Sequence, residues 1–268
     1  MRNLRSRIQP VFISHGGGPL PLLGDPGHSE MVASLEMLGA RLDRPEAIIV
    51  VSAHWEERVP TITATETPSL IYDYYGFSEE AYSITYPCRG EPSLASELHL
   101  LIESAGIDVK LDHERGLDHG VFVPLKIMYP EANVPCVQLS LLSSLEPESH
   151  IAIGEALRGL RHKNVLLIGS GFSFHNLKAF FAPDTAESSK SNREFERWLS
   201  DTCCNSTYSA EQRRQKLTRW SEDPGARYCH PREEHLLPLH VCFGAAAGEP
   251  AEVINLKVMN KESSMYVW

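Results

Sequence analysis

Three histidines follow short apolar segments that are typical of buried β-strands. They are His15, His54 and His175. The carboxyl ends of parallel strands meet at one edge of a sheet, and α/β proteins place their binding sites just beyond that edge. An imidazole can ligate a transition metal or transfer a proton near neutral pH. The sequence therefore predicts that these side chains share a metal or acid–base site.

A run of glycines, Gly16-Gly17-Gly18-Pro19, comes directly after His15. Such a run can cradle a phosphate, but neither the dinucleotide fingerprint G-x-G-x-x-G nor the P-loop pattern G-x-x-x-x-G-K-[ST] is present. Glycine also lets the backbone turn sharply and lets a ligand approach closely. We interpret the run as space around a crowded metal ligand.

A second cluster of candidate ligands occupies Cys229–Pro238. The pattern predicts a helix that begins at Pro231, because proline suits the first turn of a helix. His235 would then lie one turn further on, and Pro238 would kink the helix. Glu234 is either a carboxylate that stabilises the helix N-terminus or a ligand. Neither zinc-protease pattern, H-E-x-x-H or H-x-x-E-H, is present.

Asp118-His119-Gly120 is the remaining candidate. Asp118 either orients a histidine ring nitrogen or caps the next helix. Gly169-Ser170-Gly171 lacks the full G-x-S-x-G pattern, which argues against a serine hydrolase. The histidines without patterned neighbours are interpreted as surface or core residues: His28, His99, His113, His150, His162 and His240.

The ligand types narrow the choice of metal without fixing it. Histidines with a carboxylate suit Zn(2+), Fe(2+), Mn or Ni and not Ca or Mg. Two histidines and a carboxylate form the facial arrangement of non-haem iron oxygenases, whereas three histidines and a water suit catalytic zinc. The residues by themselves leave both arrangements open.

The elements that must position these side chains alternate between apolar strand-like runs and amphipathic helical stretches. This alternation predicts an α/β fold, a single domain over residues 1–268 with a central, mostly parallel or mixed sheet flanked by helices. Residues 184–192 are predicted to be a loop. The expected strands are 11–13, 47–51, 61–65, 107–111, 134–139, 165–168 and 252–258, and the expected helices are 31–42, 94–105 and three that open at Glu146-Pro147, Ser191 and Ser209.

Composition excludes several classes of function. The 268 residues carry a net charge of −10, which argues against nucleic acid or an anionic membrane as the main partner. No apolar run is long enough for a membrane span or a secretory signal. The six cysteines form no C-x-x-C pair, so we expect neither a disulfide framework nor a structural zinc knuckle, and we expect a cytoplasmic location.

Five short motifs occur in one order: His15–Pro19, Ser52–Trp55, Asp118–Gly120, His175–Leu177 and Glu234–Pro238. Together they resemble the class III extradiol ring-cleavage dioxygenases, in particular the DOPA-dioxygenase-type, LigB-like branch. The resemblance spans nearly the whole chain. One departure is an extra glycine in the first motif, which concerns substrate fit more than metal binding.

The resemblance implies one non-haem metal held by His15, His54 and His235. It implies that His175 is the catalytic base and a candidate fourth ligand, and that His119 is a second catalytic histidine near substrate and O2. Glu234 is the reserve third ligand. Fe(2+) is expected for activity, and Zn(2+) is expected in the protein as isolated.

The implied reaction is cleavage of the aromatic ring of a small catechol, DOPA-like or a related phenolic, by O2. Two alternatives stay open: a zinc-dependent hydrolase that uses the same histidines, and a non-catalytic binding protein on the same fold. The sequence leaves undetermined the physiological substrate, the cleavage position, the native metal and the oligomeric state.

Overall fold

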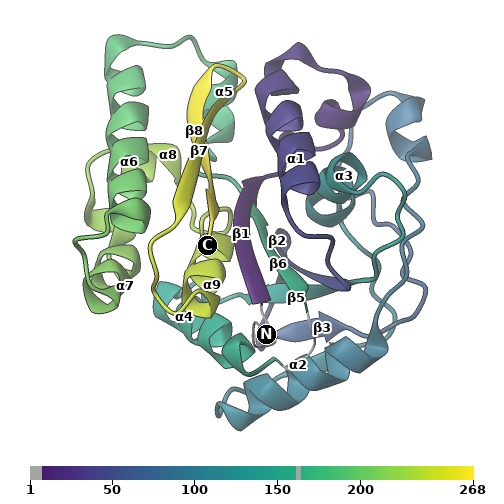
Figure 1. Cartoon of the computed structure of the whole chain (residues 1–268). Coiled ribbons are helices and arrows are strands. Elements are labelled where there is room, and N and C mark those ends of the chain that lie inside the picture. Colours follow the sequence, from purple (N-terminus) through teal and green to yellow (C-terminus); the bar gives the residue numbers. More distant parts are fainter. Residues whose placement is uncertain (1–7, 161–163) are drawn as a thin grey trace.

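One mixed β-sheet organises the computed structural model, which describes residues 8–160 and 164–268 (Figure 1). The eight strands of this part of the chain are ordered β4-β3-β5-β2-β6-β1-β8-β7. Their bounds are β1 Ile8–Ser14, β2 Ala47–Glu57, β3 Thr61–Thr63, β4 Lys110–Asp112, β5 Cys136–Leu142, β6 Val165–Gly171, β7 Glu252–Val258 and β8 Lys261–Val267.

The centre of the sheet is parallel and its edges are partly antiparallel. Strands β5, β2, β6 and β1 pair in parallel, and Ile168 of β6 lies between Val11 and Val50 in the register. The β7–β8 hairpin adds to β1 in antiparallel orientation. These central strands are continuous apolar runs because both of their faces are covered. The predicted α/β fold with a mostly parallel or mixed sheet is confirmed.

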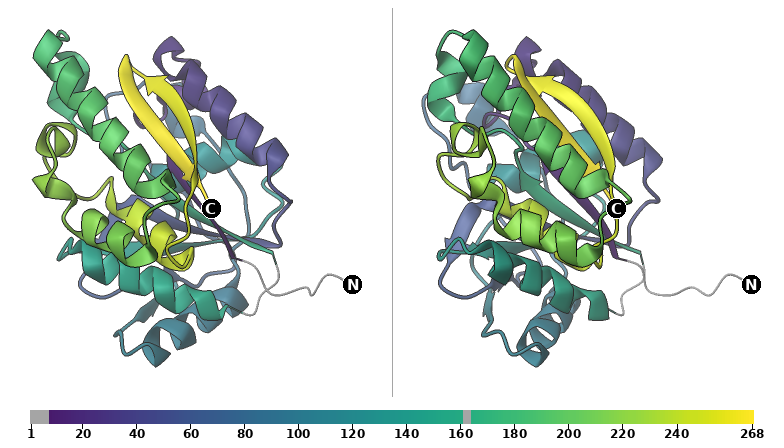
Figure 2. Two further views of the ribbon diagram at one scale, coloured as in Figure 1. Left: turned by 60° about the vertical axis from the view of Figure 1, so that its left-hand side comes forward. Right: turned by 90° about the vertical axis from the view of Figure 1, so that its left-hand side faces the viewer.

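Helices cover both faces of the sheet. Helices α9 and α4 pack together on one face, and α1 and α3 pack together on the other. Figure 2 shows the long helix α6 running beside the β7–β8 hairpin. The α-helices are α1 Ser29–Arg41, α2 Pro92–Ser104, α3 His119–Met128, α4 Pro147–Ala156, α5 Leu177–Phe181, α6 Ala186–Cys204, α7 Ala210–Thr218, α8 Ala226–Cys229 and α9 Leu237–Ala245. The 3-10 turns are Leu20–Leu23, Pro26–His28, Glu79–Ser83, Leu157–Gly159 and Trp220–Glu222.

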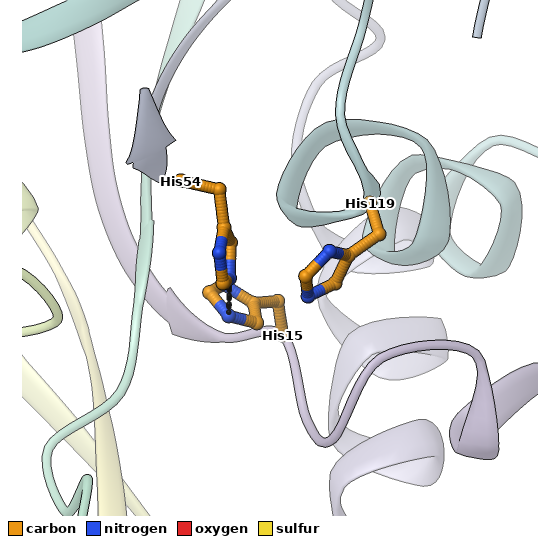
Figure 3. Close-up of side chains that lie close together, drawn as sticks. All are labelled: His15, His54 and His119. Atoms are coloured by element: carbon orange, nitrogen blue, oxygen red, sulfur yellow. Dashed lines mark hydrogen bonds between the residues drawn. The ribbon is translucent and has the colours of Figure 1, made fainter. Parts of the chain in front are cut away.

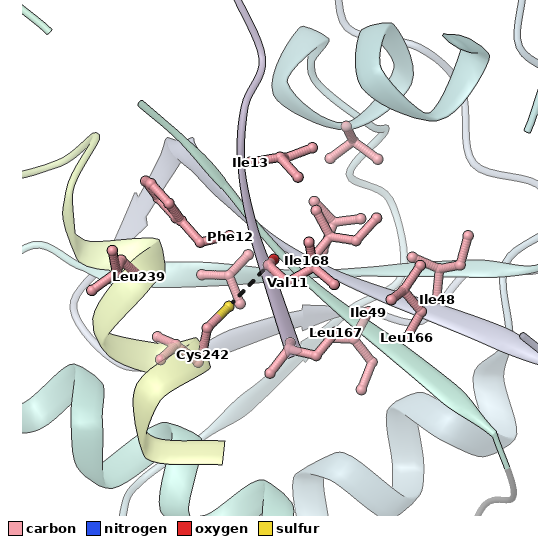
Figure 4. Packing of buried hydrophobic residues seen from close by; sticks show 14 of the residues in the cluster. Val11, Phe12, Ile13, Ile48, Ile49, Leu166, Leu167, Ile168, Leu239 and Cys242 are labelled. Carbon is pink, nitrogen blue, oxygen red and sulfur yellow. Dashed lines mark hydrogen bonds between the residues drawn. The ribbon is translucent and has the colours of Figure 1, made fainter. Parts of the chain in front are cut away.

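Strand β6 shows how the two faces are used, because successive side chains of a strand point in opposite directions. A Cβ on Gly169 would lie 2.6 Å from the Pro238 carbonyl oxygen of α9. The next residue, Ser170, points the other way and donates its hydroxyl to the Gly120 carbonyl of α3. Figure 4 shows the apolar packing between β1, β2, β6 and α9, where the Cys242 thiol donates to the Val11 carbonyl. Glycine at 169 therefore lets α9 lie directly on the sheet.

Most predicted elements correspond to observed ones, with shifted ends. The run 107–111 becomes β4 at Lys110–Asp112, and the run 134–139 becomes β5 at Cys136–Leu142. The capping box at Ser209 is confirmed, since its hydroxyl accepts the Gln212 N–H and the Gln212 side chain accepts the Ser209 N–H. His162 lies outside the described residues.

The predicted loop over residues 184–192 is wrong. Helix α6 begins at Ala186, where Thr185 and Ser188 form a reciprocal capping box. The predicted helix start at Ser191 is also wrong, because Ser191 lies inside α6. Two serine or threonine capping patterns overlap in this segment, and the earlier one starts the helix.

The predicted helix at Pro231 is wrong as well. Residues 231–236 form bends and turns, and α9 starts at Leu237 with Pro238 in its first turn. Pro238 does not kink a helix, because its missing N–H is one that the first turn leaves unpaired in any case. His235 consequently lies in the turn that precedes α9.

The sequence pattern does not predict strand β8. Its sequence, Lys261–Val267, contains two serines in a buried stretch. Ser264 donates its N–H to Ser173 Oγ and its hydroxyl to Glu196, so its polar groups are satisfied inside the protein. Buried polar side chains of this kind conceal a strand from an apolar pattern.

Across residues 8–160 and 164–268, no helix has the length and apolar character needed to cross a membrane.

Candidate metal centre

Five histidines from distant parts of the sequence line one cavity of about 340 Å³. Figure 3 shows three of them, with His15 directly after β1, His54 on β2 and His119 at the start of α3. His175 follows β6, and His235 precedes α9. The cavity thus brings together every histidine that the motifs singled out.

His15 is held in one tautomer by the sheet. Its Nδ1 is 3.0 Å from Ser170 Oγ, whose hydrogen is donated to the Gly120 carbonyl. The serine oxygen must therefore accept from Nδ1–H, which leaves the lone pair on His15 Nε2. That nitrogen is 3.0 Å from His54 Nε2. Fixing one ring nitrogen by a hydrogen bond is the usual way in which a protein orients a metal-binding histidine.

His54 projects from a bulge in β2. The register against β5 runs from Val51 paired with Leu139 to Glu56 paired with Leu141, so β2 carries extra residues over this stretch. Bulges redirect side chains near functional sites. His54 therefore lies within the strand, although the sequence suggested a position just beyond its end.

Asp73 is the carboxylate behind His119. Its Oδ1 accepts His119 Nδ1–H at 2.8 Å and the His119 backbone N–H at 3.0 Å, while its Oδ2 lies 3.8 Å from His54 Nδ1. Burial tends to raise the pKa of Asp73, but the hydrogen bonds from His119 outweigh it and hold the pKa below its usual value.

Asp118 plays neither of its two predicted parts. Its side chain makes no helix-capping hydrogen bond and accepts from Ser52 Oγ at 2.7 Å and from Gln138 Nε2, with Arg115 3.4 Å away. Burial, and then the charge of Asp73, raise the pKa of Asp118. This buried carboxylate joins β2, β5 and the start of α3 beneath the cavity.

Glu234 joins His175 and His235. Its Oε1 lies 2.9 Å from His235 Nδ1 and 3.3 Å from His175 Nδ1. Burial tends to raise the pKa of Glu234, but these two histidines outweigh it and place the pKa well below the usual range. The other oxygen, Oε2, is 3.2 Å from Arg232, which also pairs with both carboxylate oxygens of Glu56.

Three of the cavity histidines, His15, His54 and His235, are held in the neutral form by their surroundings. Burial, followed by the neighbouring imidazoles, lowers the pKa of His15 and of His54 well below the usual value. Burial, and then His175, lowers the pKa of His235 to about 3. A neutral imidazole is the form that binds a metal ion.

The glycine run turns above His15 and is tied down by His28. Gly16 has φ +82°, and a Cβ there would lie 2.7 Å from Pro21 and 2.8 Å from His28. His28 Nε2 accepts the Gly17 N–H at 3.0 Å, and its Nδ1 donates to Asp25 at 2.7 Å. The buried His28 is thus a core residue that shapes the ligand loop.

Comparison with known proteins identifies the class of this site. Residues 12–265 match the LigB family, the catalytic LigB subunit of aromatic ring-opening dioxygenase. The chain belongs to this family. The resemblance inferred from the five motifs is confirmed, and the protein is an extradiol aromatic ring-opening dioxygenase, an oxidoreductase.

Relatives of known name support the LigB assignment over most of the chain. Dioxygenase tasH of Hapsidospora irregularis is 43% identical over 266 residues, which cover 91% of this chain and 80% of that protein. The 4,5-DOPA dioxygenase extradiol of Portulaca grandiflora is 37% identical over 248 residues, with 88% and 86% covered. The crystal structure of an uncharacterized protein from Escherichia coli K12 is 32% identical, with a TM-score of 0.75 and coverage of 97% and 99%.

LigB-family enzymes depend on a non-haem metal, and the donor set here fits one. Two nitrogens bound to one ion at roughly 2.1 Å each lie about 3.0–3.4 Å apart. The Nε2 atoms of His15 and His54 are 3.0 Å apart. Two groups have ligand atoms within 4.8 Å of one another: His15, His54 and His119, and also His175, Glu234 and His235.

Three functional contacts escaped the sequence analysis. Asp73 lies in the aromatic segment Tyr72–Phe77, which gave no sign of a carboxylate partner for His119. The sequence suggests only a nucleophilic role for Ser170, yet Ser170 orients His15. The third contact is the hydrogen bond that His28 accepts from the Gly17 N–H. The i, i+3 spacing of Asp25 and His28 is its one signal in the sequence.

Proposed function

We propose that this LigB-family chain opens the ring of a small catechol with O2 at a metal held by His15, His54 and His235. The observation that carries the proposal is a nearly equilateral triangle of imidazoles inside the cavity. The ring centroids are 4.8 Å apart for His15 and His54, 5.0 Å for His54 and His235, and 5.3 Å for His15 and His235.

The hydrogen bonds of two of these rings support the ligand set. His15 and His235 each have Nδ1 bonded to a partner, Ser170 and Glu234, which leaves Nε2 for a ligand. Glu234 is therefore proposed as the group that orients His235 and not as the third ligand itself. An Fe(2+) ion, when bound here, supplies redox chemistry between a catecholate and O2, which Zn(2+) cannot because it has no accessible redox change.

His175 is proposed as the base that takes a hydroxyl proton from the catechol. Its Nδ1 faces Glu234, so its Nε2 is the nitrogen available as a proton acceptor. The carboxylate behind the ring stabilises the imidazolium that forms when the proton is taken. An imidazole with this support is a suitable base near neutral pH.

His119 is proposed as the second catalytic histidine. Asp73 occupies its Nδ1 in the same way, and Nε2 remains to contact substrate or O2. Its ring centroid lies 4.0 Å from that of His54, so it borders the proposed ligand triangle. His119 could instead complete a triad with His15 and His54, and metal content distinguishes the two roles.

Metal content of single variants tests the ligand assignment. The His235→Ala protein should be isolated without a stoichiometric metal, and the His119→Ala protein should retain it, as measured by plasma mass spectrometry. Retention by the first variant and loss by the second would assign His119 as the third ligand.

The activity test uses protein loaded anaerobically with Fe(2+) and then exposed to O2 and a panel of catechols. O2 uptake with a yellow ring-opened product, seen with Fe(2+) and not with Zn(2+), is the expected result. Activity with Zn(2+) and without O2 would instead indicate hydrolysis. Relatives named as 4,5-DOPA dioxygenases make DOPA one member of the panel.

The six free cysteines, five of them buried, support the expected cytoplasmic location.

A further inference from the structure

The cavity wall beyond the histidines is almost entirely apolar. It is formed by two segments, the aromatic loop Tyr72–Phe77 after β3 and the short helix α5, together with the β7–β8 turn. The side chains that matter here are Tyr75, Phe77, Leu177, Phe180, Phe181 and Met259. A cavity of about 340 Å³ is within the range that accommodates drug-sized ligands, so it has room for more than one small ring.

Helix α5 presents two apolar side chains to solvent at this cavity. Phe180 is fixed by ring contacts with Phe172 and Phe174, at centroid distances of 5.7 and 5.3 Å. Leu177 and Phe181, four residues apart on one side of the helix, are 62% and 81% exposed. Across the cavity, Tyr75 is 92% exposed.

This exposure is concentrated at the site. Among the residues that the structure describes, six large apolar side chains are exposed, and three of them line this cavity. Exposed apolar surface gathered at one place commonly marks a binding site. The gathering at the cavity mouth indicates that something apolar covers these side chains when the site is occupied.

The charges around the cavity argue against an acidic ligand. In the described part of the chain, no lysine or arginine lines it, and Asp73 is its one lining carboxylate. Asp73 directs Oδ1 to His119, and its Oδ2 lies 3.8 Å from His54. A ligand carboxylate placed here would lose water without gaining a cationic partner.

We propose that the site takes an uncharged catechol with an apolar substituent, whose tail lies between α5 and the aromatic loop. This inference rests on the proposed function for the catechol end of the ligand. The histidines hold the diol, and Leu177, Phe181 and Tyr75 cover the tail. An amino acid such as DOPA fits this wall less well, because its carboxylate would find no cationic partner here.

Calorimetric binding to the Zn(2+)-loaded full chain tests the proposal without turnover. The ligands are 4-methylcatechol, 4-butylcatechol, 4-hexylcatechol, 3,4-dihydroxyphenylacetate and DOPA. We expect the Kd to fall about fourfold for each added methylene until the tail leaves the cavity. We expect the two ligands that carry a carboxylate, 3,4-dihydroxyphenylacetate and DOPA, to bind at least tenfold more weakly than 4-butylcatechol. Carboxylate-bearing ligands that bind as tightly as 4-butylcatechol, or a Kd independent of chain length, would overturn the substrate class.

Variants locate the tail. Leu177→Ala and Phe181→Ala should each reduce the affinity ratio of hexylcatechol to methylcatechol several-fold. Leu100→Ala is the matched control, because Leu100 is 60% exposed on α2 and does not line the cavity, and the ratio should stay unchanged. Leu177→Arg should strengthen binding of 3,4-dihydroxyphenylacetate. Equal affinity ratios in the original protein and in the three alanine variants would mean that the tail does not lie against α5.

Turnover by the Fe(2+)-loaded enzyme separates the two proposals. Ring opening with a preference for the catechols that carry a carboxylate would retain the function and reject the substrate class. A failure to open any catechol, with the chain-length dependence of binding intact, would reject the function and retain an apolar diol as the ligand.

Discussion

The imidazole rings of His175 and His235 lie nearly parallel, with centroids 3.3 Å apart and planes 16° apart. Their Nδ1 atoms both face Oε1 of Glu234. Because the rings are stacked and share this anchor, their Nε2 atoms both point away from Glu234. One carboxylate therefore orients a proposed metal ligand and a proposed base together.

A variant of His175 distinguishes its two candidate roles, general base and fourth metal ligand. In the His175→Ala protein we expect kcat to fall by about 10²–10⁴, the usual contribution of a general base, while bound metal stays near one equivalent. Steady-state kinetics and metal analysis of the same preparation give both values. Loss of the metal from this variant would make His175 a fourth ligand.

The carboxylate behind His119 can be tested in the same way. We expect Asp73→Asn to lower kcat about 10- to 100-fold with metal retained, because the amide no longer fixes the ring or stabilises its charged form. The exposed Asp43 provides a matched control, and Asp43→Asn should leave kcat unchanged. An unchanged kcat in Asp73→Asn would remove Asp73 from the catalytic arrangement.

Arg232 extends the anchor to the protein surface. It pairs with both oxygens of Glu56 at 2.6 and 2.7 Å and reaches Glu234 at 3.2 Å. We expect Arg232→Lys to weaken metal binding up to about tenfold, because an ammonium group cannot make this forked contact. Competition with a chelator measures the metal affinity. Arg214 also makes several contacts to carboxylates, with two N–H groups on one oxygen of Glu148 and a third on Glu155, and these residues do not line the cavity, so Arg214→Lys should leave metal affinity unchanged. Equal metal affinities in Arg232→Lys and Arg214→Lys would show that Arg232 does not influence metal binding through Glu234.

Glu196 makes stability depend on pH at a place away from the metal site. Burial raises its pKa from 4.5 to about 7, against the opposing hydrogen bond from Ser264. Between these values the folded protein keeps a proton that the unfolded chain releases, so stability decreases as pH rises, by up to about 1.4 kcal/mol per unit.

Chemical unfolding of the metal-free protein between pH 5 and pH 8 measures this slope. Glu196→Gln does not titrate, so it should gain about 1–3 kcal/mol over the original protein on going from pH 5 to pH 8. Glu194→Gln, a more exposed change on the same helix, should show the original pH dependence. Parallel curves for the Glu196→Gln and original proteins would contradict the prediction.

The loop over His15 requires glycine at position 16. Gly16→Ala combines a positive φ with contacts of 2.7–3.0 Å to Pro21, His28 and Met31, and we expect a loss of about 2 kcal/mol or more. Gly76 has a similar φ of +80° but open space around it. Gly76→Ala should therefore cost about 1 kcal/mol, and denaturant midpoints that coincide would show that crowding at Gly16 is unimportant.

The sequence predicts the structure best where one physical pattern determines it. The apolar runs before His15 and before His175 are short and bounded by polar residues or glycine, which is typical of buried strands, and parallel strands meet at one edge. Asp73 could not be found in this way, because its loop has no periodicity and its contact with His119 spans 46 residues. The start of α9 was also missed, since Pro231 and Pro238 are equally suitable for a first turn.

The position of β1 in the strand order affects how the chain folds during synthesis. Strand β1 is made before the other strands of the sheet, but its neighbours are β6 and β8, which end at Gly171 and Val267. Its backbone groups therefore stay without their sheet partners until most of the chain has left the ribosome. Such late, long-range pairing slows folding and leaves an apolar strand open to aggregation. Expression yield should respond to chaperones and to growth temperature more than the stability of the folded protein suggests.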